Sequence, residues 1–244
     1  MPNLKVLQML NAGYDDALAY LRPGLTLCNA RGVHDASTAE LAVGLAISSR
    51  RGFPEFMREQ IAGNWSHHRT AALSDSKVGI IGFGSIGKKI AQNLSGFEVS
   101  ITAFTQSGRD GSLTMDQLDT HLPELDIVIL ILPLSDSSRH LFNKARLAKM
   151  KDGALLINVA RGPVVDTEAL LHELNSKRIF AALDVTDPEP LPAGHPLWSA
   201  PNLQIVPHVG GNSEAFEPRG RALIESQLRL LASGKPLEHV VAQG

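Results

Sequence analysis

Cysteine is nearly missing from this sequence, since Cys28 is the single one among 244 residues. An internal disulfide is therefore excluded, and the chain suits a reducing compartment, so we expect a cytoplasmic protein. A lone cysteine is most often a small buried side chain rather than a reactive group. We accordingly expect Cys28 to be buried at the end of a strand.

Long apolar runs and an excess of charge of one sign are missing as well. No apolar stretch is long enough to span a membrane, and the formal net charge is −2. These absences give no reason to expect a nucleic acid or a membrane as a partner. His67 and His68 are adjacent but have no third ligand nearby, so we expect them to be solvated and predict no metal site.

The most informative stretch present is glycine-rich and covers residues 77–91. Residues 78–81 read as a buried strand, Gly82, Gly84 and Gly87 form a G-x-G-x-x-G turn, and a helical pattern follows. In a dinucleotide site the first glycine permits the turn, the second lets the backbone approach a pyrophosphate, and the third lets the helix pack on the strand. The helix N-terminus then holds the anion. The alternative is a glycine-rich surface turn, but the flanking strand and helix favour a dinucleotide site.

Strands and helices alternate after this turn. Apolar runs predict strands at 99–104, 127–132, 154–158, 179–184 and 203–206, and helical patterns lie at 115–122, 144–150 and 167–176. Continuous apolar strands are typical of a parallel sheet that is covered on both faces. The alternation therefore predicts an α/β fold with a doubly wound parallel sheet of the Rossmann type.

The two ends of the chain have a different pattern. Residues 4–9 and 25–28 read as strands around a short helix at 16–21, and the polar segment 29–35 could be a hinge. An amphipathic helix is predicted at 213–232.

Two further helices precede the glycine turn. Ser37 or Thr38 caps a helix at 39–49 that is made mostly of small apolar residues, and an amphipathic helix follows at 54–62. Both offer apolar surface that one Rossmann sheet does not need, so we predict a homodimer.

In a sheet of this kind, ligands bind at the carboxyl ends of the strands. Three predicted strand ends carry Arg161, Glu189 and His208. A histidine exchanges protons near neutral pH, and an arginine fork matches a substrate carboxylate. Singly, Arg161 or Glu189 could form a surface salt bridge and His208 could be a buried capping residue. Together, on three strand ends, they favour a catalytic site.

With these motifs the chain resembles the D-isomer-specific 2-hydroxyacid dehydrogenases. The glycine turn, the segment from 151–153 to 161–162, the segment 184–190 and Pro207-His208 match that family's motifs in order, over nearly the whole chain. The resemblance implies a Rossmann domain for NAD(P), here residues 36–212. It is inserted into a flavodoxin-like substrate domain, of which 1–35 and 213–244 would be an incomplete remnant.

The resemblance also implies an activity and its residues. Hydride would pass between the nicotinamide and a small 2-keto acid or D-2-hydroxy acid, such as glyoxylate or hydroxypyruvate. His208 would be the base in oxidation and the acid in reduction, Glu189 would fix its tautomer, and Arg161 would anchor the substrate carboxylate beside the substrate loop Asn11-Ala12-Gly13. Asp184 would approach the nicotinamide amide, with a turn cap as the alternative. The candidate cofactor-binding residues are Gly82, Gly84, Ser85, Ile86, Gly87, Thr105, Arg109, Pro133, Ala160, Asp184 and Gly210.

The choice between NAD and NADP depends on the end of the second strand. NAD enzymes usually place Asp or Glu there to hold the ribose 2′-hydroxyl, but no carboxylate occurs before Asp110. Thr105, Ser107 and Arg109 could receive a 2′-phosphate instead, so we expect NADP(H), with dual use as the next choice. The alternative is an Arg109 side chain that points to solvent.

Two other functions stay open at this point. One is a nicotinamide-sensing binding protein, similar to the C-terminal binding protein co-repressors, and the other is a cofactor-binding fragment without activity. Family members begin with a complete β-α-β-α-β half of the substrate domain, whereas this chain opens at a late strand of it. We therefore expect a truncated form, or a gene start assigned at an internal Met1, that binds the cofactor yet turns over poorly.

Overall fold

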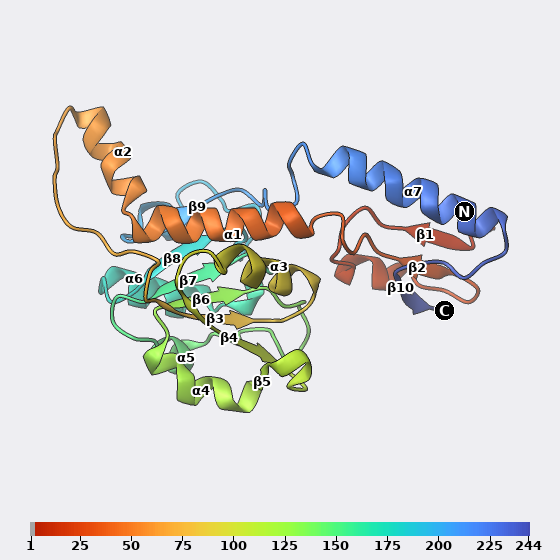
Figure 1. Cartoon of the computed structure of the whole chain (residues 1–244), viewed down its shortest axis with the longest axis horizontal. Helices are drawn as coiled ribbons and strands as arrows, with labels where there is room; N and C mark the ends of the chain where they lie inside the picture. Colours follow the sequence, from red (N-terminus) through yellow and green to blue (C-terminus); the bar gives the residue numbers. More distant parts are fainter. Residues whose placement is uncertain (1–2) are drawn as a thin grey trace.

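The strands of this chain are divided between two sheets in a computed structural model that describes residues 3–244 (Figure 1). Met1, the position expected to be an internal start, lies outside the described residues. The larger sheet has seven strands, and every pairing within it is parallel. In spatial order these strands are β5 (Leu113–Thr114), β4 (Ser100–Thr105), β3 (Lys77–Ile81), β6 (Ile127–Leu130), β7 (Leu155–Asn158), β8 (Phe180–Leu183) and β9 (Leu203–Ile205).

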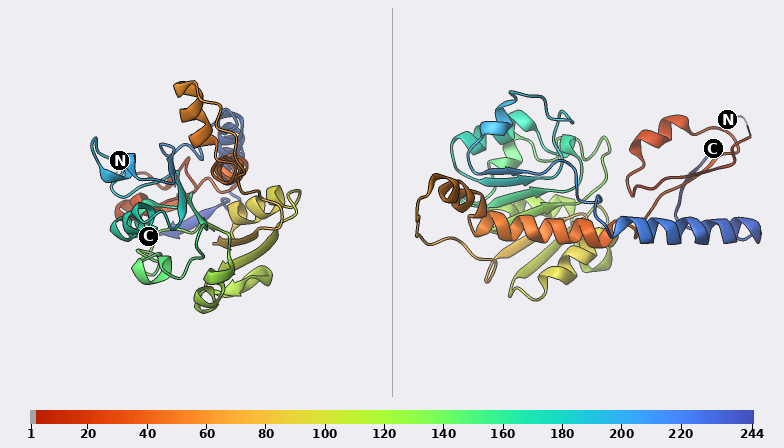
Figure 2. Two further views of the ribbon diagram at one scale, coloured as in Figure 1. Left: turned by 90° about the vertical axis from the view of Figure 1, so that its left-hand side faces the viewer. Right: turned by 90° about the horizontal axis from the view of Figure 1, so that it is seen from above.

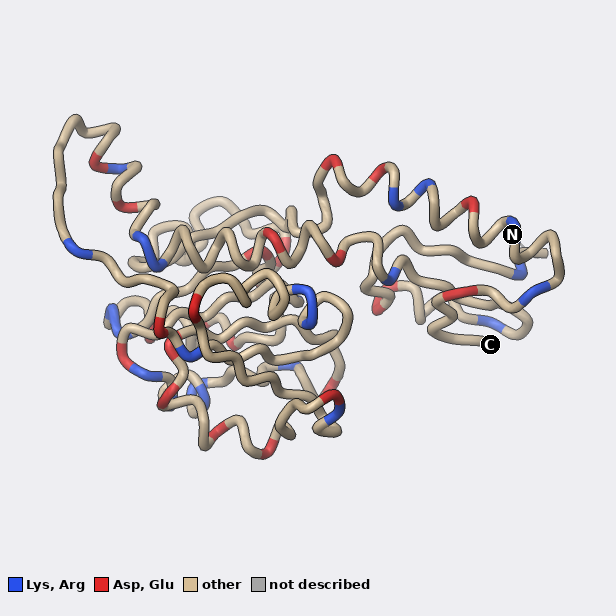
Figure 3. Tube along the Cα trace, viewed as in Figure 1, with Lys and Arg blue, Asp and Glu red and all other residues tan. Residues whose placement is uncertain are grey.

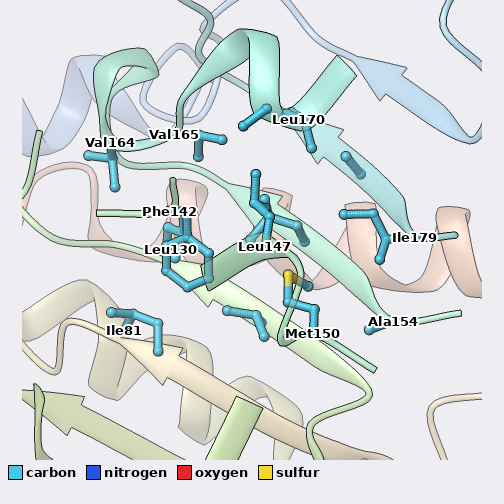
Figure 4. Packing of buried hydrophobic residues seen from close by; sticks show 14 of the residues in the cluster. Ile81, Leu130, Phe142, Leu147, Met150, Ala154, Val164, Val165, Leu170 and Ile179 are labelled. Carbon is cyan, nitrogen blue, oxygen red and sulfur yellow. The ribbon is translucent and has the colours of Figure 1, made fainter. Parts of the chain in front are cut away.

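Helices cover both faces of this sheet. One face packs on α4 (Leu118–His121), α5 (Lys144–Leu147) and α6 (Thr167–Asn175), with Phe104 and Phe142 fully buried there. Figure 4 shows part of this layer around Leu147 and Met150. The other face packs on α1 (Asp35–Arg50) and α3 (Ser85–Leu94). Strands β3, β6 and β7 are almost wholly buried, as a sheet covered on both sides requires. The predicted α/β fold with a doubly wound parallel sheet is confirmed.

The smaller sheet joins the two ends of the chain. Strands β1 (Val6–Gln8) and β2 (Thr26–Cys28) pair in parallel, and β10 (Val240–Gln243) pairs antiparallel with β2. Helix α7 (Phe216–Ala232) lies over this sheet (Figure 1), held by Gln227, whose amide donates to Gln8 Oε1 and to the carbonyl of Glu238. Cys28 is fully buried at the end of β2, as predicted, and burial raises the pKa of its thiol. The domain boundaries at 35/36 and 212/213 stay a prediction.

Two long helices connect the sheets, and a third projects from the body. In Figure 2, α1 over the large sheet and α7 over the small sheet lie nearly end to end. At the far end of α1, helix α2 (Phe53–Ala62) rises away from the rest of the chain (Figure 1). Phe53, Met57, Ile61 and the following Trp65 are exposed on this arm. Charges of both signs are scattered over the two parts (Figure 3).

Several element ends differ from the predictions. Helix α1 begins at Asp35, so Ser37 and Thr38 lie inside it rather than at its cap. The predicted helix at 115–122 is split into α4 and two 3-10 helices, because Pro123 starts a new turn. Strands β5 and β10 were not predicted. Further 3-10 helices occupy Asp15–Tyr20, where an ordinary helix was expected, Arg109–Gly111, Gly162–Val164 and Pro196–Ser199.

Candidate active site

The glycine turn connects β3 to α3, and each of its glycines has a different local reason. Gly82 has φ of 102°, and a side chain there would overlap the carbonyl of Ile131. A Cβ on Gly87 would overlap the carbonyl of Gly82, so the helix could not pack so closely on the turn. Gly84 differs, because a Cβ there would meet no atom within 4 Å. Gly84 is also the N-cap of α3 and supplies no side-chain acceptor.

This arrangement fits a dinucleotide. The amides of the first turn, on Ser85, Ile86 and Gly87, begin a ten-residue helix with open space beside Gly84. An anion bound there meets the positive end of the helix dipole as well as unsatisfied N–H groups. The residues predicted from the motif are thus brought together in one turn at the N-terminus of α3.

The turn after β4 is organised by hydroxyl groups. Thr105 is buried and its hydroxyl lies 2.7 Å from that of Ser112, which in turn donates to the carbonyl of Arg109 at 2.6 Å. The hydroxyl of Thr105 therefore holds the turn. The Arg109 side chain is exposed, while the Asp110 carboxylate accepts from Lys88 of α3 at 2.9 Å, which lowers the pKa of Asp110.

Arg161 follows β7 in a loop that is fixed at two points. The Asn158 side chain accepts from the Ala160 amide at 3.1 Å and donates to the Arg161 carbonyl at 2.9 Å, so Asn158 positions this loop. A Cβ on Gly162 would overlap the carbonyl of Thr186, so only glycine lets this loop lie against the segment that leads to Glu189.

The small sheet supplies the opposite wall of this region. Gly13 lies against the guanidinium of Arg161, so closely that a Cβ on Gly13 would overlap Nη2. Asp15 lies 3.4 Å from Arg161 Nε, and the Ala160 carbonyl accepts from Nη1 at 2.8 Å. The carbonyls of Asn11 and Ala12 are occupied by the Ala30 amide and the Asn29 side chain, respectively. The predicted substrate loop and Arg161 are therefore in contact.

His208 and Glu189 form a pair across two strand ends. His208 Nδ1 lies 2.5 Å from Glu189 Oε1, and both side chains are partly exposed. Among residues 3–244, no protein group accepts from or donates to His208 Nε2. A carboxylate on Nδ1 fixes the tautomer and leaves Nε2 for proton exchange with a ligand.

Asp184 holds the loop that carries His208. Its carboxylate is buried and accepts from the amides of Val209 at 2.6 Å and Gly210 at 3.0 Å. Burial raises the pKa of Asp184, and the two amides oppose this effect without cancelling it. The alternative role, a turn cap, is therefore observed, and contact with a nicotinamide amide stays a prediction.

One further candidate belongs to the loop after β6, and some site residues were missed. Pro133 accepts from the Ser138 hydroxyl at 2.8 Å in the loop after β6. Asp15 was missed as a partner of Arg161, although it lies only two residues after the predicted substrate loop. His34 was missed too, because both groups that contact its ring nitrogens are backbone carbonyls distant in sequence. Among the residues described, no cluster of three or more His, Cys, Asp or Glu side chains is placed to hold a metal ion. None of the helices described is both long and apolar enough to cross a bilayer.

The class of protein follows from this fold and site together with a family match. The family model for the NAD binding domain of D-isomer specific 2-hydroxyacid dehydrogenases matches residues 43–210, which is more than half of the chain. The chain belongs to this family and is an NAD(P)-dependent oxidoreductase of it.

Individual relatives are similar over most of the chain. Glyoxylate reductase of Thermofilum pendens is 37% identical, over 90% of this chain and 69% of the relative. A D-isomer specific 2-hydroxyacid dehydrogenase family protein from Aeromonas salmonicida superposes with a TM-score of 0.90 at 30% identity, over 99% of this chain and 79% of that one. An NADPH-dependent glyoxylate/hydroxypyruvate reductase from Sinorhizobium meliloti was solved with NADP and sulfate. It superposes with a TM-score of 0.86 at 28% identity, over 98% of this chain and 79% of that one.

Proposed function

We propose that this protein reduces a small 2-keto acid, of the glyoxylate or hydroxypyruvate type, to the D-2-hydroxy acid with NADPH. The observation that carries the proposal is the His208–Glu189 pair, with Nδ1 2.5 Å from the carboxylate and Nε2 left without a protein partner. Relatives at 33 to 37% identity that are named glyoxylate or hydroxypyruvate reductases support this substrate class.

The acid in this reaction is His208. When bound, the nicotinamide supplies the hydride that the keto carbon receives. His208 Nε2–H donates its proton to the carbonyl oxygen as that oxygen gains negative charge, and the ring returns to the neutral form. Glu189 stabilises the imidazolium before this transfer and keeps the remaining proton on Nδ1. In oxidation His208 takes the proton in the reverse direction.

Arg161 binds the substrate carboxylate in this proposal. Its planar fork can face a carboxylate with two N–H groups. The Ala160 carbonyl already orients the guanidinium through Nη1, and Gly13 leaves room for it because it has no side chain. Since Asp15 lies 3.4 Å from Nε, part of the guanidinium charge is balanced before a substrate enters.

The preference for NADPH depends on Arg109. The exposed guanidinium lies in the turn after β4, where a ribose 2′-phosphate would give it a charge-assisted partner. Asp110, the carboxylate that could repel that phosphate, is paired with Lys88 at 2.9 Å. The relative from Sinorhizobium meliloti, NADPH-dependent by name, supports the same choice.

We also propose that the protein is a homodimer joined through the α2 arm. Phe53, Met57 and Ile61 are spaced four residues apart and so lie on one face of α2. With Trp65, 94% exposed, they form an apolar strip that the described part of the chain does not cover. A self-complementary strip of this kind suits a two-fold interface.

The direct test is a steady-state assay with a panel of 2-keto acids and both reduced cofactors. We expect turnover with glyoxylate or hydroxypyruvate, faster with NADPH than with NADH. His208→Asn should lower kcat by about 100-fold or more, the range lost with a general acid, while NADPH affinity stays within about twofold of the wild type. Arg109→Ala should weaken the binding of NADPH but not that of NADH. A preference of the wild-type protein for NADH would contradict the proposed role of Arg109. A folded protein that consumes neither cofactor with any keto acid would contradict the proposed activity.

A further inference from the structure

His34 occupies the junction between the two sheets and contacts three separate segments. Its Nε2 lies 2.7 Å from the carbonyl oxygen of Leu10, and its Nδ1 lies 3.0 Å from the carbonyl oxygen of Gly211. The ring also stacks on Phe216, the first residue of α7, with 5.1 Å between ring centroids and 8° between planes. Gly211 fits against the ring only as glycine, because a Cβ there would lie 2.8 Å from Nδ1.

The two carbonyls belong to the two walls of the candidate site. Leu10 directly precedes the loop Asn11-Ala12-Gly13, which lies against Arg161. Gly211 ends the loop that begins at His208, and Asp184 holds the two residues between them. His34 therefore ties the substrate-facing loop of the small sheet to the acid–base loop of the large sheet.

The hydrogen bonds that His34 can form with the two carbonyls depend on how many of its ring nitrogens carry a proton. Carbonyl oxygens accept hydrogen bonds and cannot donate them, whereas a neutral imidazole has one N–H and one acceptor nitrogen. A neutral His34 would donate to one carbonyl and place its lone pair against the other. An imidazolium donates at both nitrogens, so only this form completes both hydrogen bonds.

The charged residues nearest to His34 in the sequence lie on its own segment and at the start of α7. The segments that supply its partners, residues 7–13 and 209–213, contain no charged residue. Arg31 and Asp35 lie on the segment of His34 itself, where the Asp35 carboxylate accepts from the Gly32 amide at 3.2 Å. On the side of Phe216, the charged residues are Glu214, Glu217 and, one turn further, Arg219. Glu217 pairs with Arg221 at 2.9 Å.

We propose that His34 is a positioning residue which, as an imidazolium, fastens the substrate loop to the His208 loop and so closes the site between the two sheets. The kinetic part of this inference rests on the proposed keto-acid reduction. The bridge itself does not, because the protonation of His34 can be measured without any turnover.

The first measurement is nitrogen NMR of the full-length chain labelled with 15N-histidine, with the His34 signals assigned by their loss in His34→Gln. We expect both ring nitrogens of His34 to carry protons at neutral pH, as in an imidazolium. Signals of a neutral tautomer, with one unprotonated nitrogen, would overturn the proposal. This result is independent of whether the protein reduces a keto acid.

The second measurement is the separation of KM from kcat in two variants. His34→Phe keeps a ring on Phe216 but removes both donors, so KM for glyoxylate should rise about tenfold. The kcat and the NADPH affinity should stay within about twofold, because the proton donor and the glycine turn are unchanged. His34→Gln retains one donor and should lie between the wild type and His34→Phe.

The matched control is His67→Gln, which changes an exposed histidine in the segment after α2 and should leave KM unchanged. An unchanged KM in His34→Phe, or an equal loss of kcat and NADPH affinity, would overturn the positioning role. If the wild-type protein reduces no keto acid, the proposed function fails, and the NMR result alone decides whether His34 forms the bridge.

Discussion

The backbone of His208 has φ of 53°, a region that residues with a side chain seldom adopt. Its amide donates to the carbonyl of Asp184 at 2.7 Å, and the Asp184 carboxylate accepts from the next two amides. These bonds offset the roughly 1 kcal/mol that such a conformation costs. Asparagine tolerates this region better than most residues, which is why His208→Asn removes the imidazole without a change in the backbone.

The buried carboxylate of Asp184 predicts a specific pH dependence of stability. Burial raises the pKa of Asp184 above the unfolded value of about 3.9. Between these two values the native state binds more protons than the unfolded state, so the contribution of Asp184 to the free energy of unfolding falls as pH rises. Urea unfolding from pH 4 upward should show this decline in the wild type and not in Asp184→Asn.

Asp126→Asn provides a control for that experiment, because the contribution of Asp126 to the free energy of unfolding should change with pH in the opposite direction. Although burial opposes the effect, hydrogen bonds from Lys151 and from the Lys77 amide lower the pKa of Asp126. Its contribution is therefore lost as pH falls below about 4, rather than as pH rises. A difference between wild type and Asp184→Asn that does not change with pH would contradict the prediction.

At the scale of single elements, two glycines of the turn between β3 and α3 should affect different quantities, Gly87 the stability of the fold and Gly84 the affinity for the cofactor. A Cβ on Gly87 would overlap the Gly82 carbonyl, whereas a Cβ on Gly84 would enter open space with φ of −77°. Gly87→Ala should therefore destabilise the protein by about 1–3 kcal/mol, the cost of overpacking. Gly84→Ala should stay within about 0.5 kcal/mol of the wild type in stability.

Cofactor affinity should separate the two variants as well, because Gly84→Ala should lose NADPH affinity while it keeps nearly all of its stability. Gly84→Ala fills the space beside the first turn of α3, so we expect the NADPH dissociation constant to rise about tenfold or more, about 1.4 kcal/mol. Chemical unfolding and fluorescence titration of each variant measure the two quantities. Wild-type NADPH affinity in Gly84→Ala would show that the pyrophosphate does not bind at this turn.

Sequence patterns predicted the elements whose signal is local. The buried runs of β3, β6, β7 and β8 were found because a parallel sheet covered on both sides requires continuous apolar residues. Strand β10 was missed because its half-buried residues are defined by pairing with β2, more than 200 residues away in sequence. The start of α1 was misplaced because its N-cap, His34, has no side-chain cap and instead contacts distant carbonyls.

In the candidate site, too, the residues at strand ends could be predicted, whereas contacts between distant segments could not. Asn158 ends a strand, and Arg161, Glu189 and His208 each follow one, so their common edge could be inferred from the topology of the sheet. The need for glycine at 162 could not, because the overlapping carbonyl belongs to Thr186 on another strand end. The contact of Gly13 with Arg161 likewise depends on how the two sheets are placed.

At the scale of the whole molecule, the α2 arm predicts the assembly. Met57 and Ile61 are 63% and 87% exposed, and an apolar strip of this kind on a projecting helix suits burial against a second copy. The double variant Met57→Glu with Ile61→Glu should convert a dimer into a monomer in light scattering. Leu228→Glu, 59% exposed on α7, is the matched control and should leave the dimer intact. A wild-type monomer, or dissociation by Leu228→Glu alone, would contradict the placement of the interface.

The chain passes between the two sheets twice, once before α1 and once before α7, and these crossings lie together at His34. Two adjacent crossings act as a hinge with one axis, so opening is a rotation of one part against the other. His208 and Glu189 belong to the same part, and this rotation leaves their 2.5 Å separation unchanged. Gly13 and Arg161 belong to different parts and separate as the hinge opens. In the proposed reaction, His208 and Glu189 therefore stay paired whether the two parts are open or closed, and only closure brings the substrate loop against Arg161.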